Sequence, residues 1–438
     1  MCIFQDSRED WEKESAMMGD VYQGSALNIA ATGSSDGNGG LFHSRDPLDL
    51  LPLSIETSWS AATAIVDTDH SKGLDINSSY TIYPKKFWHD ELSNAVLLTR
   101  GWVLQERVLC PRMLHFSTNQ LLWECLEHDA SESYPGGRPD KYITKNSLSQ
   151  TDAYKPVKPL TDIGELERSD NIVNTKFVRW KLIVTMVCTT AFTKSSDKLA
   201  ALSGVAKNMR LPKDDEYLAG IWKSEIFGFL FWFVPDGRQA DGTRSQRVKP
   251  YVAPSWSWAS LDAVIDYRVM SLYAIFLKII ETKIELATKD PTGQVLSGFL
   301  RLTGPVIPLR IPDPIYVSSD IDGMTMTAMR DLEMSAFWGY LDQEKGQPVF
   351  LNDEALHASL KPDFPFDSTA ELFFLATEFD WSWRMSGMII RDSGKGDGSY
   401  ERVGYAAFNN DESKEKWTIE YETAWPLLEP FVKEIVLV

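Results

Sequence analysis

The stretch 100–125 constrains the fold most, because its residue pattern changes from helical to alternating within a short distance. The pattern predicts a helix over 101–109, and Pro111 ends it because proline removes a backbone donor and clashes with the preceding turn. The alternating segments RMLHFS and QLLWEC then predict a hairpin with its turn at Thr118 and Asn119.

The even length of the connecting loop fixes which side chains of this hairpin share a face. We expect the core face to carry Leu114, Phe116, Leu121, Trp123 and Cys125. We expect the other, mixed face to carry His115, Ser117, Gln120 and Glu124.

The first forty residues predict a helix, a short buried strand and a glycine-rich loop. Asp6 has the place of an N-cap with Glu9 as its capping partner, and the helix stripe consists of Trp11, Ser15, Met18 and Tyr22. The strand is expected at 26–32 and the loop at 33–40, with a further strand at 61–66 and a helix at 91–98. The order helix, strand, loop, helix, hairpin indicates an α/β layer.

The remainder of the chain predicts an α+β region with long helices and then a β-rich part. Turn-forming residues make 131–170 a linker. The expected helices span 172–192, 197–209 with Ser196 as cap, and a wholly buried 217–234. The PSWSWAS segment from Pro254 is read as a packed strand after a proline turn. Further strands are expected at 277–287, 297–309, 371–377, 386–391, 402–408 and 432–438.

Composition excludes some classes of function. The formal net charge of −18 argues against binding a nucleic-acid backbone, although a local basic pocket for a nucleotide-sized ligand stays open. No apolar run approaches the roughly 18 residues of a membrane span, and the N-terminus lacks the features of a signal peptide. The 15 tryptophans and 21 phenylalanines predict a large aromatic core. Four widely spaced cysteines favour free thiols and a cytoplasmic location.

Several segments together resemble the heterokaryon-incompatibility (HET) domain of filamentous fungi. They are CIFQDSREDWEKESAMMGDVYQGSALNIAATG, RGWVLQERVLCPRMLHFSTNQLLWEC, DKLAALSGVA, YLAGIW and APSWSWAS, which lie in the family's order over residues 1–262. The resemblance implies a partial HET domain at 1–130, the linker at 131–170, a helical region at 171–262 that ends in PSWSWAS, and a β-rich C-terminal region at 263–438.

The family usually begins with a strand that resembles Y-x-x-L-S-Y-x-W-G. Here Met1 directly precedes Cys2, so the resemblance implies an N-terminally incomplete domain without that first strand. Either the gene model begins too late or the protein is a truncated variant, and in the latter case it could be an inactive remnant.

The HET domain is similar to Toll/interleukin-1 receptor (TIR) domains, some of which cleave NAD, so a TIR-like fold is implied. Plant TIR domains carry W-C-L-x-E with a catalytic Glu, and Trp102-Val103-Leu104-Gln105-Glu106 has the same spacing. The resemblance makes Glu106 the candidate catalytic residue and Trp102 a pocket wall on the same helix face. A carboxylate there would stabilise the oxocarbenium-like state of glycosidic cleavage. The structural alternative has Trp102 in the core and Glu106 paired with Arg100, Arg107 or Arg112, since a buried carboxylate needs a partner.

Four residues of the same region could ligate zinc: Cys110, His115, Cys125 and His128. Their spacing matches no common zinc finger, and His115 and Cys125 face opposite sides of the expected hairpin, so structural thiols are favoured. A nucleophilic pair of Cys110 with His115 is disfavoured because the C-terminal end of a helix destabilises a thiolate. We therefore expect no metal and no cofactor.

The function implied by the family is non-self recognition and programmed cell death, carried out by a non-enzymatic association and signalling module. Its expected partners are proteins, including a second copy of the chain, and neither nucleic acid nor a membrane span is expected. The alternative is a TIR-like NAD glycohydrolase that uses Glu106, with NAD as substrate.

Overall fold

In the computed structural model, the chain divides into two units. Unit 1 comprises Met1–Gly19 and Ile163–Val438, and unit 2 comprises Asp20–Asp162. The structure describes residues 4, 6–46, 53–58, 77–82, 88, 91–92, 95–125, 127–137, 175–209, 215–235, 237–267, 272–309, 356–363, 371–380, 385–410, 425 and 428–438. The predicted strand at 61–66 and most of the predicted linker lie outside the described residues.

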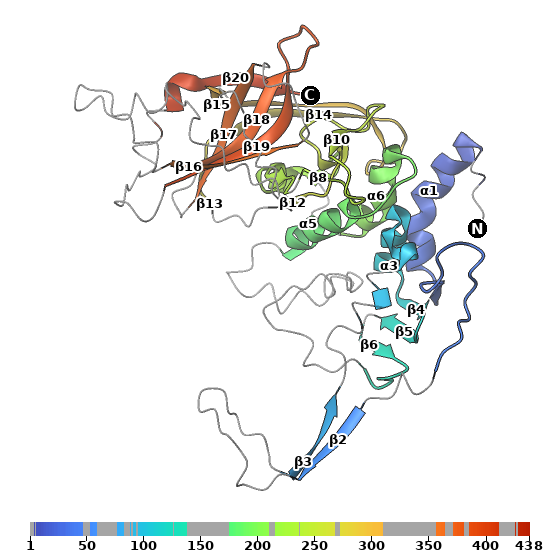
Figure 1. Cartoon of the computed structure of the whole chain (residues 1–438). Helices are drawn as coiled ribbons and strands as arrows, with labels where there is room; N and C mark the ends of the chain where they lie inside the picture. The colour runs from blue at the N-terminus through green and yellow to red at the C-terminus, as the bar shows by residue number, and fades with distance from the viewer. Residues whose placement is uncertain are drawn as a thin grey trace. The chain divides into compact units, whose positions relative to one another are not determined.

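Unit 2 contains the mixed α/β layer that the sequence predicts (Figure 1). Its four-stranded sheet has the order β1-β4-β5-β6, in which β1 runs parallel to β4 and the other pairs are antiparallel. The strands are β1 (Asn28–Ala30), β4 (Arg112–Phe116), β5 (Leu121–Cys125) and β6 (Asp129–Ser131), and the helix before β4 is α3 (Gly101–Leu109). A separate antiparallel pair consists of β2 (Leu53–Ser58) and β3 (Asn77–Ile82).

The predicted hairpin is confirmed in register, but the expected distribution of burial between its faces is wrong. Leu114 lies opposite Trp123 and His115 opposite Leu122, as the turn position requires. Leu114 and Trp123 are only half-buried, whereas His115 and Leu122 are fully buried. The polar face tolerates burial because its side chains satisfy one another, as described below.

The N-terminal elements differ from the sequence prediction in detail. Helix α1 (Arg8–Gln23) begins after Ser7, whose hydroxyl accepts a hydrogen bond from the Asp10 amide at 3.3 Å. Asp10 in turn accepts from the Phe4 amide at 2.8 Å, so the cap is one residue later than expected and Glu9 is not its partner.

Three further expectations in unit 2 are corrected. Strand β1 is shorter than the expected 26–32, and Ile29 is 53% exposed because β1 lies at the edge of its sheet. The expected helix at 91–98 is interrupted, because Ala95 has an extended backbone and a separate 3₁₀ helix, Val96–Thr99, follows it. Residue 131, the predicted start of the linker, still belongs to β6.

Unit 1 contains two of the three predicted helices. Helix α5 (Thr175–Cys188) buries Trp180, and α6 (Lys198–Asn208) follows a 3₁₀ helix at Ser195–Asp197. The N-cap of α6 is Asp197, which makes no side-chain capping bond, so the prediction of Ser196 as the cap is wrong.

The prediction of a helix at 217–234 is wrong, although most of this segment is buried, as predicted. The segment forms β7 (Tyr217–Leu218), β8 (Ile221–Trp222), a 3₁₀ helix (Lys223–Glu225), α7 (Ile226–Leu230) and β9 (Trp232–Phe233). Ala219 and Gly220 have φ angles of 48° and 102°, so a tight turn replaces the helix. Gly220 is required there, because a Cβ would overlap the Trp258 indole.

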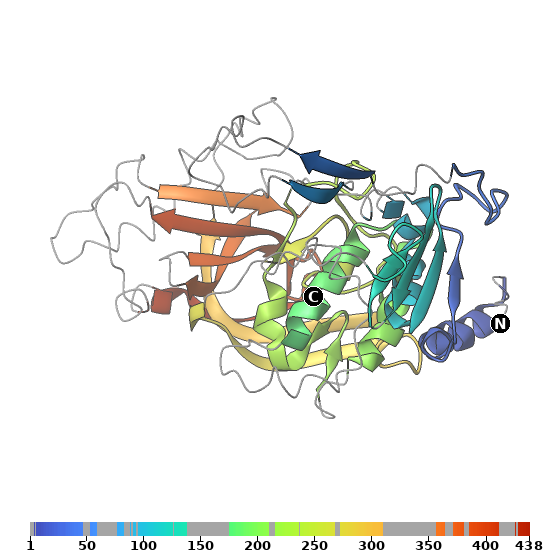
Figure 2. The same cartoon turned by 90° about the horizontal axis from the view of Figure 1, so that it is seen from below.

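The C-terminal part is β-rich, as predicted. Six predicted strands are confirmed: β14 (Lys278–Leu286), β15 (Val295–Leu309), β17 (Leu372–Asp380), β18 (Met385–Asp392), β19 (Tyr400–Asn410) and β20 (Val432–Leu437). Strands β13 (Leu272–Ile275) and β16 (Leu356–Pro362) were not predicted. The path β17-β18-β19-β20-β15 returns to β17, so the eight-stranded sheet closes on itself. Figures 1 and 2 show β17, β18 and β19 on a side of unit 1 away from α5 and α6, whereas the connection between β14 and β15 reaches α6, where the hydroxyls of Thr292 and Ser203 are 3.0 Å apart.

The PSWSWAS segment lies in the core of unit 1, but it is not a strand. It forms a turn and a 3₁₀ helix, Trp258–Ser260, which leads into β11 (Leu261–Asp262) beside β10 (Gln246–Arg247). Trp256 and Trp258 are fully buried, as are Trp180 and Trp232, which agrees with the predicted aromatic core. Among the helices formed by described residues, none combines the length and apolar character needed to cross a membrane.

Candidate functional site

Helix α3 in unit 2 holds the two residues that the sequence nominates for catalysis. Seven of its nine residues are buried, and the two that remain partly accessible are Trp102 and Glu106. Their spacing of four residues places both side chains on one face of the helix. The aromatic ring and the carboxyl group therefore share the accessible side of α3.

The Glu106 carboxylate is engaged by a tyrosine from a different helix. The Tyr22 hydroxyl of α1 donates a hydrogen bond to it, and the charge of Arg100 attracts it. Burial raises the pKa of Glu106, and the contacts with Tyr22 and Arg100 oppose this shift only in part. Burial also raises the pKa of Tyr22, and the neighbouring Glu106 adds to that effect. The carboxyl group thus keeps its proton to a higher pH than an exposed glutamate does.

The three arginines considered as partners of Glu106 have different positions. Arg100 is the one that acts on Glu106 through its charge. Arg107 directs its guanidinium at Glu124 of β5, with Nε 2.7 Å from Oε2 and Nη2 bonded to Oε1. Arg112 is an exposed residue at the start of β4.

The Arg107–Glu124 pair belongs to a buried polar network that joins α3 to β4, to β5 and to the end of β1. His115 of β4 lies with Nε2 3.0 Å from Glu124 Oε2, and its Nδ1 lies 2.8 Å from the hydroxyl of Thr32, which follows β1. All four side chains belong to buried residues, with Glu124 at 6% and Arg107 at 5% exposure. Burial alone would raise the pKa of Glu124, but Arg107 and His115 hold it well below its usual range.

A hydroxyl, an imidazole and a carboxylate in series are also the parts of an activated nucleophile. The Thr32 hydroxyl is buried, however, and it is already engaged by His115 and by the Ala30 carbonyl, 3.5 Å away. The network therefore fixes α3 against the sheet, and its four polar groups compensate one another.

The side chains of the four candidate zinc ligands do not point toward a common position. The Cys110 thiol lies 3.5 Å from the Arg107 carbonyl, and the Cys125 thiol lies 3.2 Å from that of His128. Both ring nitrogens of His115 already face Thr32 and Glu124, so neither is directed at Cys110. Burial raises the pKa of the Cys110 thiol to about 11, which disfavours a thiolate. Within the described ranges, no group of three or more His, Cys, Asp or Glu residues is arranged to hold a metal ion.

Sequence reasoning missed Tyr22 as a partner of Glu106, and Thr32 and Glu124 as members of a network. A signal existed for one pair, since the predicted register already placed His115 and Glu124 on the same face of the hairpin. Tyr22 and Thr32 carried no such signal, because each meets its partner more than eighty residues away in the sequence.

Comparison with known families finds a match for the N-terminal part of the chain. Residues 1–106 match the family model described as Heterokaryon incompatibility protein (HET), and the match includes Trp102 and Glu106. No curated protein and no solved structure matches the chain.

Proposed function

Taking residues 1–106 as HET-domain sequence, we propose that the protein acts in fungal non-self recognition and programmed cell death as a non-enzymatic association and signalling module. The family match is the observation that carries this proposal. The proposed setting is the cytoplasm, and the proposed partners are proteins, a second copy of the chain among them.

The edge of the unit 2 sheet supports an associating role. Strand β1 ends the strand order, so one side of its backbone has no neighbouring strand within the described sheet. Leu27 and Ile29 at this edge are 41% and 53% exposed. An edge strand with exposed apolar side chains suits the addition of a strand from a partner.

The surroundings of Glu106 support a structural role for this carboxyl group. The Tyr22 hydroxyl and the charge of Arg100 already satisfy it, as a half-buried acid on a helix requires. A residue held in this way connects Tyr22 to α3 within unit 2 without any ligand.

A TIR-like NAD glycohydrolase is the second candidate, because two observations favour it. Trp102 and Glu106 are the two α3 residues that are not fully buried, and the pKa of Glu106 is raised, as is common for catalytic acids. The TIR-like fold itself is part of this second proposal.

NAD turnover by the purified chain distinguishes the two candidates. The variant Glu106→Gln removes the charge and keeps the shape, and Glu127→Gln changes an exposed glutamate of the same unit as a matched control. The signalling proposal expects the same background hydrolysis in all three proteins. Turnover that is present in the parent and in Glu127→Gln but absent in Glu106→Gln would establish the enzyme instead.

Expression in a filamentous fungus tests the signalling proposal directly. Over-expression of the chain should impair growth, Glu106→Gln should act like the parent, and Ile29→Lys at the β1 edge should weaken the effect. The absence of any growth defect, from this chain and from a form extended at its N-terminus, would refute the proposal.

A further inference from the structure

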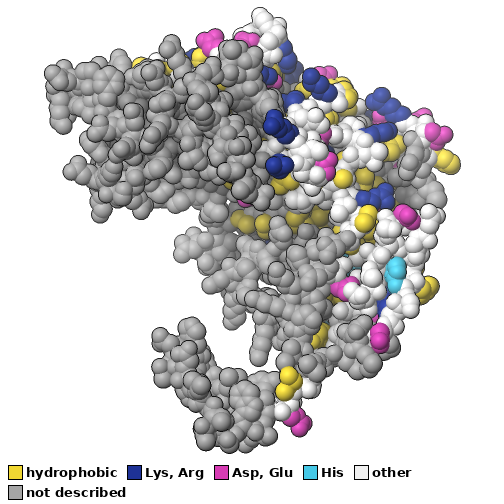
Figure 3. Space-filling model, viewed as in Figure 1, with side chains coloured by type: hydrophobic (Ala, Val, Ile, Leu, Met, Phe, Trp, Pro, Cys, Tyr) yellow, Lys and Arg dark blue, Asp and Glu magenta, His cyan; other side chains and the backbone are white. Residues whose placement is uncertain are grey.

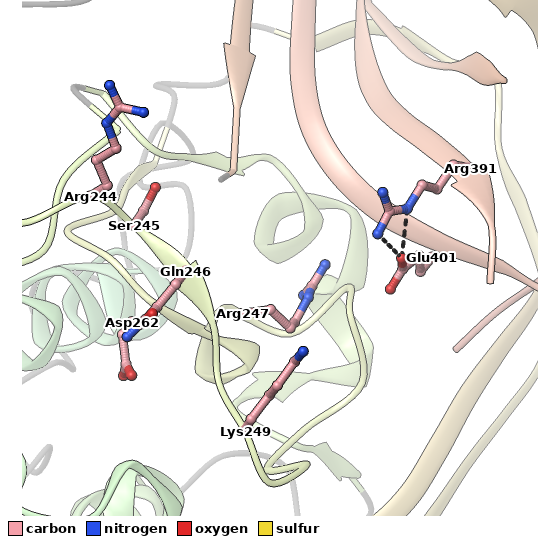
Figure 4. A pocket seen from close by; sticks show the side chains of 8 residues that line it. All are labelled: Arg244, Ser245, Gln246, Arg247, Lys249, Asp262, Arg391 and Glu401. Carbon is pink, nitrogen blue, oxygen red and sulfur yellow. Dashed lines mark hydrogen bonds and ion pairs between the residues drawn. The ribbon is translucent and has the colours of Figure 1, made fainter. Parts of the chain in front are cut away.

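A pocket of about 770 Å³ lies in unit 1, within the part of the chain that follows the HET match. The segment around β10 provides one wall with Arg244, Ser245, Arg247 and Lys249, and Arg391 of β18 and Glu401 of β19 face it. Figure 4 shows Arg247 and Lys249 directed toward the Arg391–Glu401 pair. The volume is within the range of about 300–1,000 Å³ that small-molecule sites occupy.

The pocket has an excess of positive charge in a chain with a net charge of −18. Both acidic lining residues are already neutralised. Glu401 lies 2.6 Å from Arg391, and Asp262 lies 2.6 Å from Lys198. Within the described part of the chain, the Arg244 and Lys249 side chains form no ion pair. On the face drawn in Figure 3, Lys and Arg side chains lie over unit 1 with Asp and Glu side chains among them.

Arg247 is held in place by the protein interior. Its Nη1 donates to the Ser260 hydroxyl at 2.6 Å, and its Nη2 donates to the Arg402 carbonyl at 2.5 Å. Burial lowers the pKa of this guanidinium, and the nearby carboxylates of Asp363 and Glu401 oppose the shift. An anion in the pocket would stabilise the charged guanidinium further, in a geometry that needs little reorganisation.

Ser245 provides a second, independent sign of a ligand. The residue is 2% exposed, and its hydroxyl has no hydrogen-bond partner among the residues that the structure describes. Its amide already donates to the Gly237 carbonyl at 2.9 Å. A buried hydroxyl without a partner is unfavourable, and a ligand oxygen in the pocket would accept from it.

From these groups we infer that the pocket binds a small organic polyphosphate, recognised through its phosphate groups. Guanidinium, ammonium and hydroxyl donors are the groups that bind phosphate oxygens, and two or more phosphates match the charge of Arg244, Arg247 and Lys249. None of the eight lining residues, all of them described, is aromatic. A nucleobase would therefore find no ring to stack on, and the phosphates carry the recognition.

Calorimetric titration of the full chain with inorganic diphosphate tests this inference. The variant pair Arg244→Gln with Lys249→Gln should weaken binding at least tenfold. The control pair Lys278→Gln with Lys283→Gln, exposed on β14, changes the net charge equally and should leave binding unchanged. Raising the salt concentration should weaken binding as well. No heat of binding at millimolar diphosphate, or the same loss in both variant pairs, would overturn the inference.

Two further measurements separate a built site from general attraction to a basic surface. Ser245→Ala should weaken diphosphate binding several-fold while the melting temperature stays unchanged or rises. Unaltered affinity in this variant would overturn the assignment of Ser245. ADP and diphosphate should bind with similar affinity, whereas a much tighter ADP complex would overturn recognition through phosphates alone.

Discussion

Replacing Glu124 by glutamine should destabilise unit 2 strongly. The substitution keeps the shape of the side chain and removes the negative charge that faces Arg107 and His115. Because the Arg107 guanidinium is only 5% exposed, it cannot turn into water when its partner is lost. Breaking one side of such a buried pair costs about 3–5 kcal/mol, which we take as the expected loss of unfolding free energy.

The effect should depend on pH in a defined direction. The folded-state pKa of Glu124 lies well below its usual range, so its stabilising contribution is complete above the unfolded pKa of about 4.3. It is then lost as the pH falls toward the folded-state value. The difference between parent and variant should be constant from neutral pH down to roughly pH 5 and should shrink below that.

Hydrogen exchange of β4 and β5 during urea titration measures this difference locally, in a chain of two units. Glu127→Gln, an exposed change in the same unit, should leave the exchange unaffected. The pair Arg107→Met with Glu124→Leu should recover much of the loss, because no unpaired charge stays buried. A loss below about 1 kcal/mol for Glu124→Gln is typical of exposed pairs and would refute our account of the network.

Three further changes test other parts of the structure. Arg402→Met leaves the fully buried Asp363 without its guanidinium partner and should lower the unfolding free energy of unit 1 by about 3–5 kcal/mol. Amide hydrogen exchange in β19 should then be faster, and unchanged exchange would contradict the burial of this pair. Gly220→Ala forces a side chain into a positive-φ turn against Trp258 and should lower the unfolding free energy by about 1–3 kcal/mol in urea, whereas a neutral effect would exclude that turn. Because the folded-state pKa of Glu106 is raised, its stabilising contribution is present below the unfolded-state pKa and is lost as the pH rises through the folded-state pKa. The melting temperature of Glu106→Gln should therefore rise relative to that of the parent between pH 4 and pH 8, and a constant difference in melting temperature would refute the shift.

The sequence predicted elements well where one local pattern dominated. The helix 101–109, the hairpin register and six C-terminal strands all follow from helical spacing or alternation over several residues. The prediction for the segment 217–234 failed because its charged residues and its serine, Lys223, Ser224 and Glu225, are adjacent and the rest is almost entirely apolar, so periodicity could not distinguish a helix from short strands around a turn. Gly220, which adopts a positive φ in that turn, was a local indication of it in the sequence.

The candidate site was harder to predict, because binary patterning assigns polar residues to the surface. That assumption fails at His115 and Glu124, which are buried because Arg107 and Thr32 reach them from other elements. It also fails in unit 1, where Arg247 lies within a pocket although the chain is acidic overall. The hairpin register indicates that His115 and Glu124 share a face, but local spacing contains no information on their contacts with Arg107 and Thr32, since those depend on how separate elements pack.

Two glutamates of unit 2 illustrate how packing divides roles between similar residues. Glu124 has a guanidinium and an imidazole as partners, and together they outweigh the effect of burial and favour its charged form, so the residue stabilises the fold. Glu106 has a tyrosine hydroxyl and a more weakly acting Arg100, so burial favours its protonated form. Because Arg107 is directed at Glu124, Glu106→Gln leaves the buried network intact. A change in NAD turnover or in growth inhibition in that variant therefore reports on Glu106 itself, whereas Glu124→Gln reports on the architecture that supports α3.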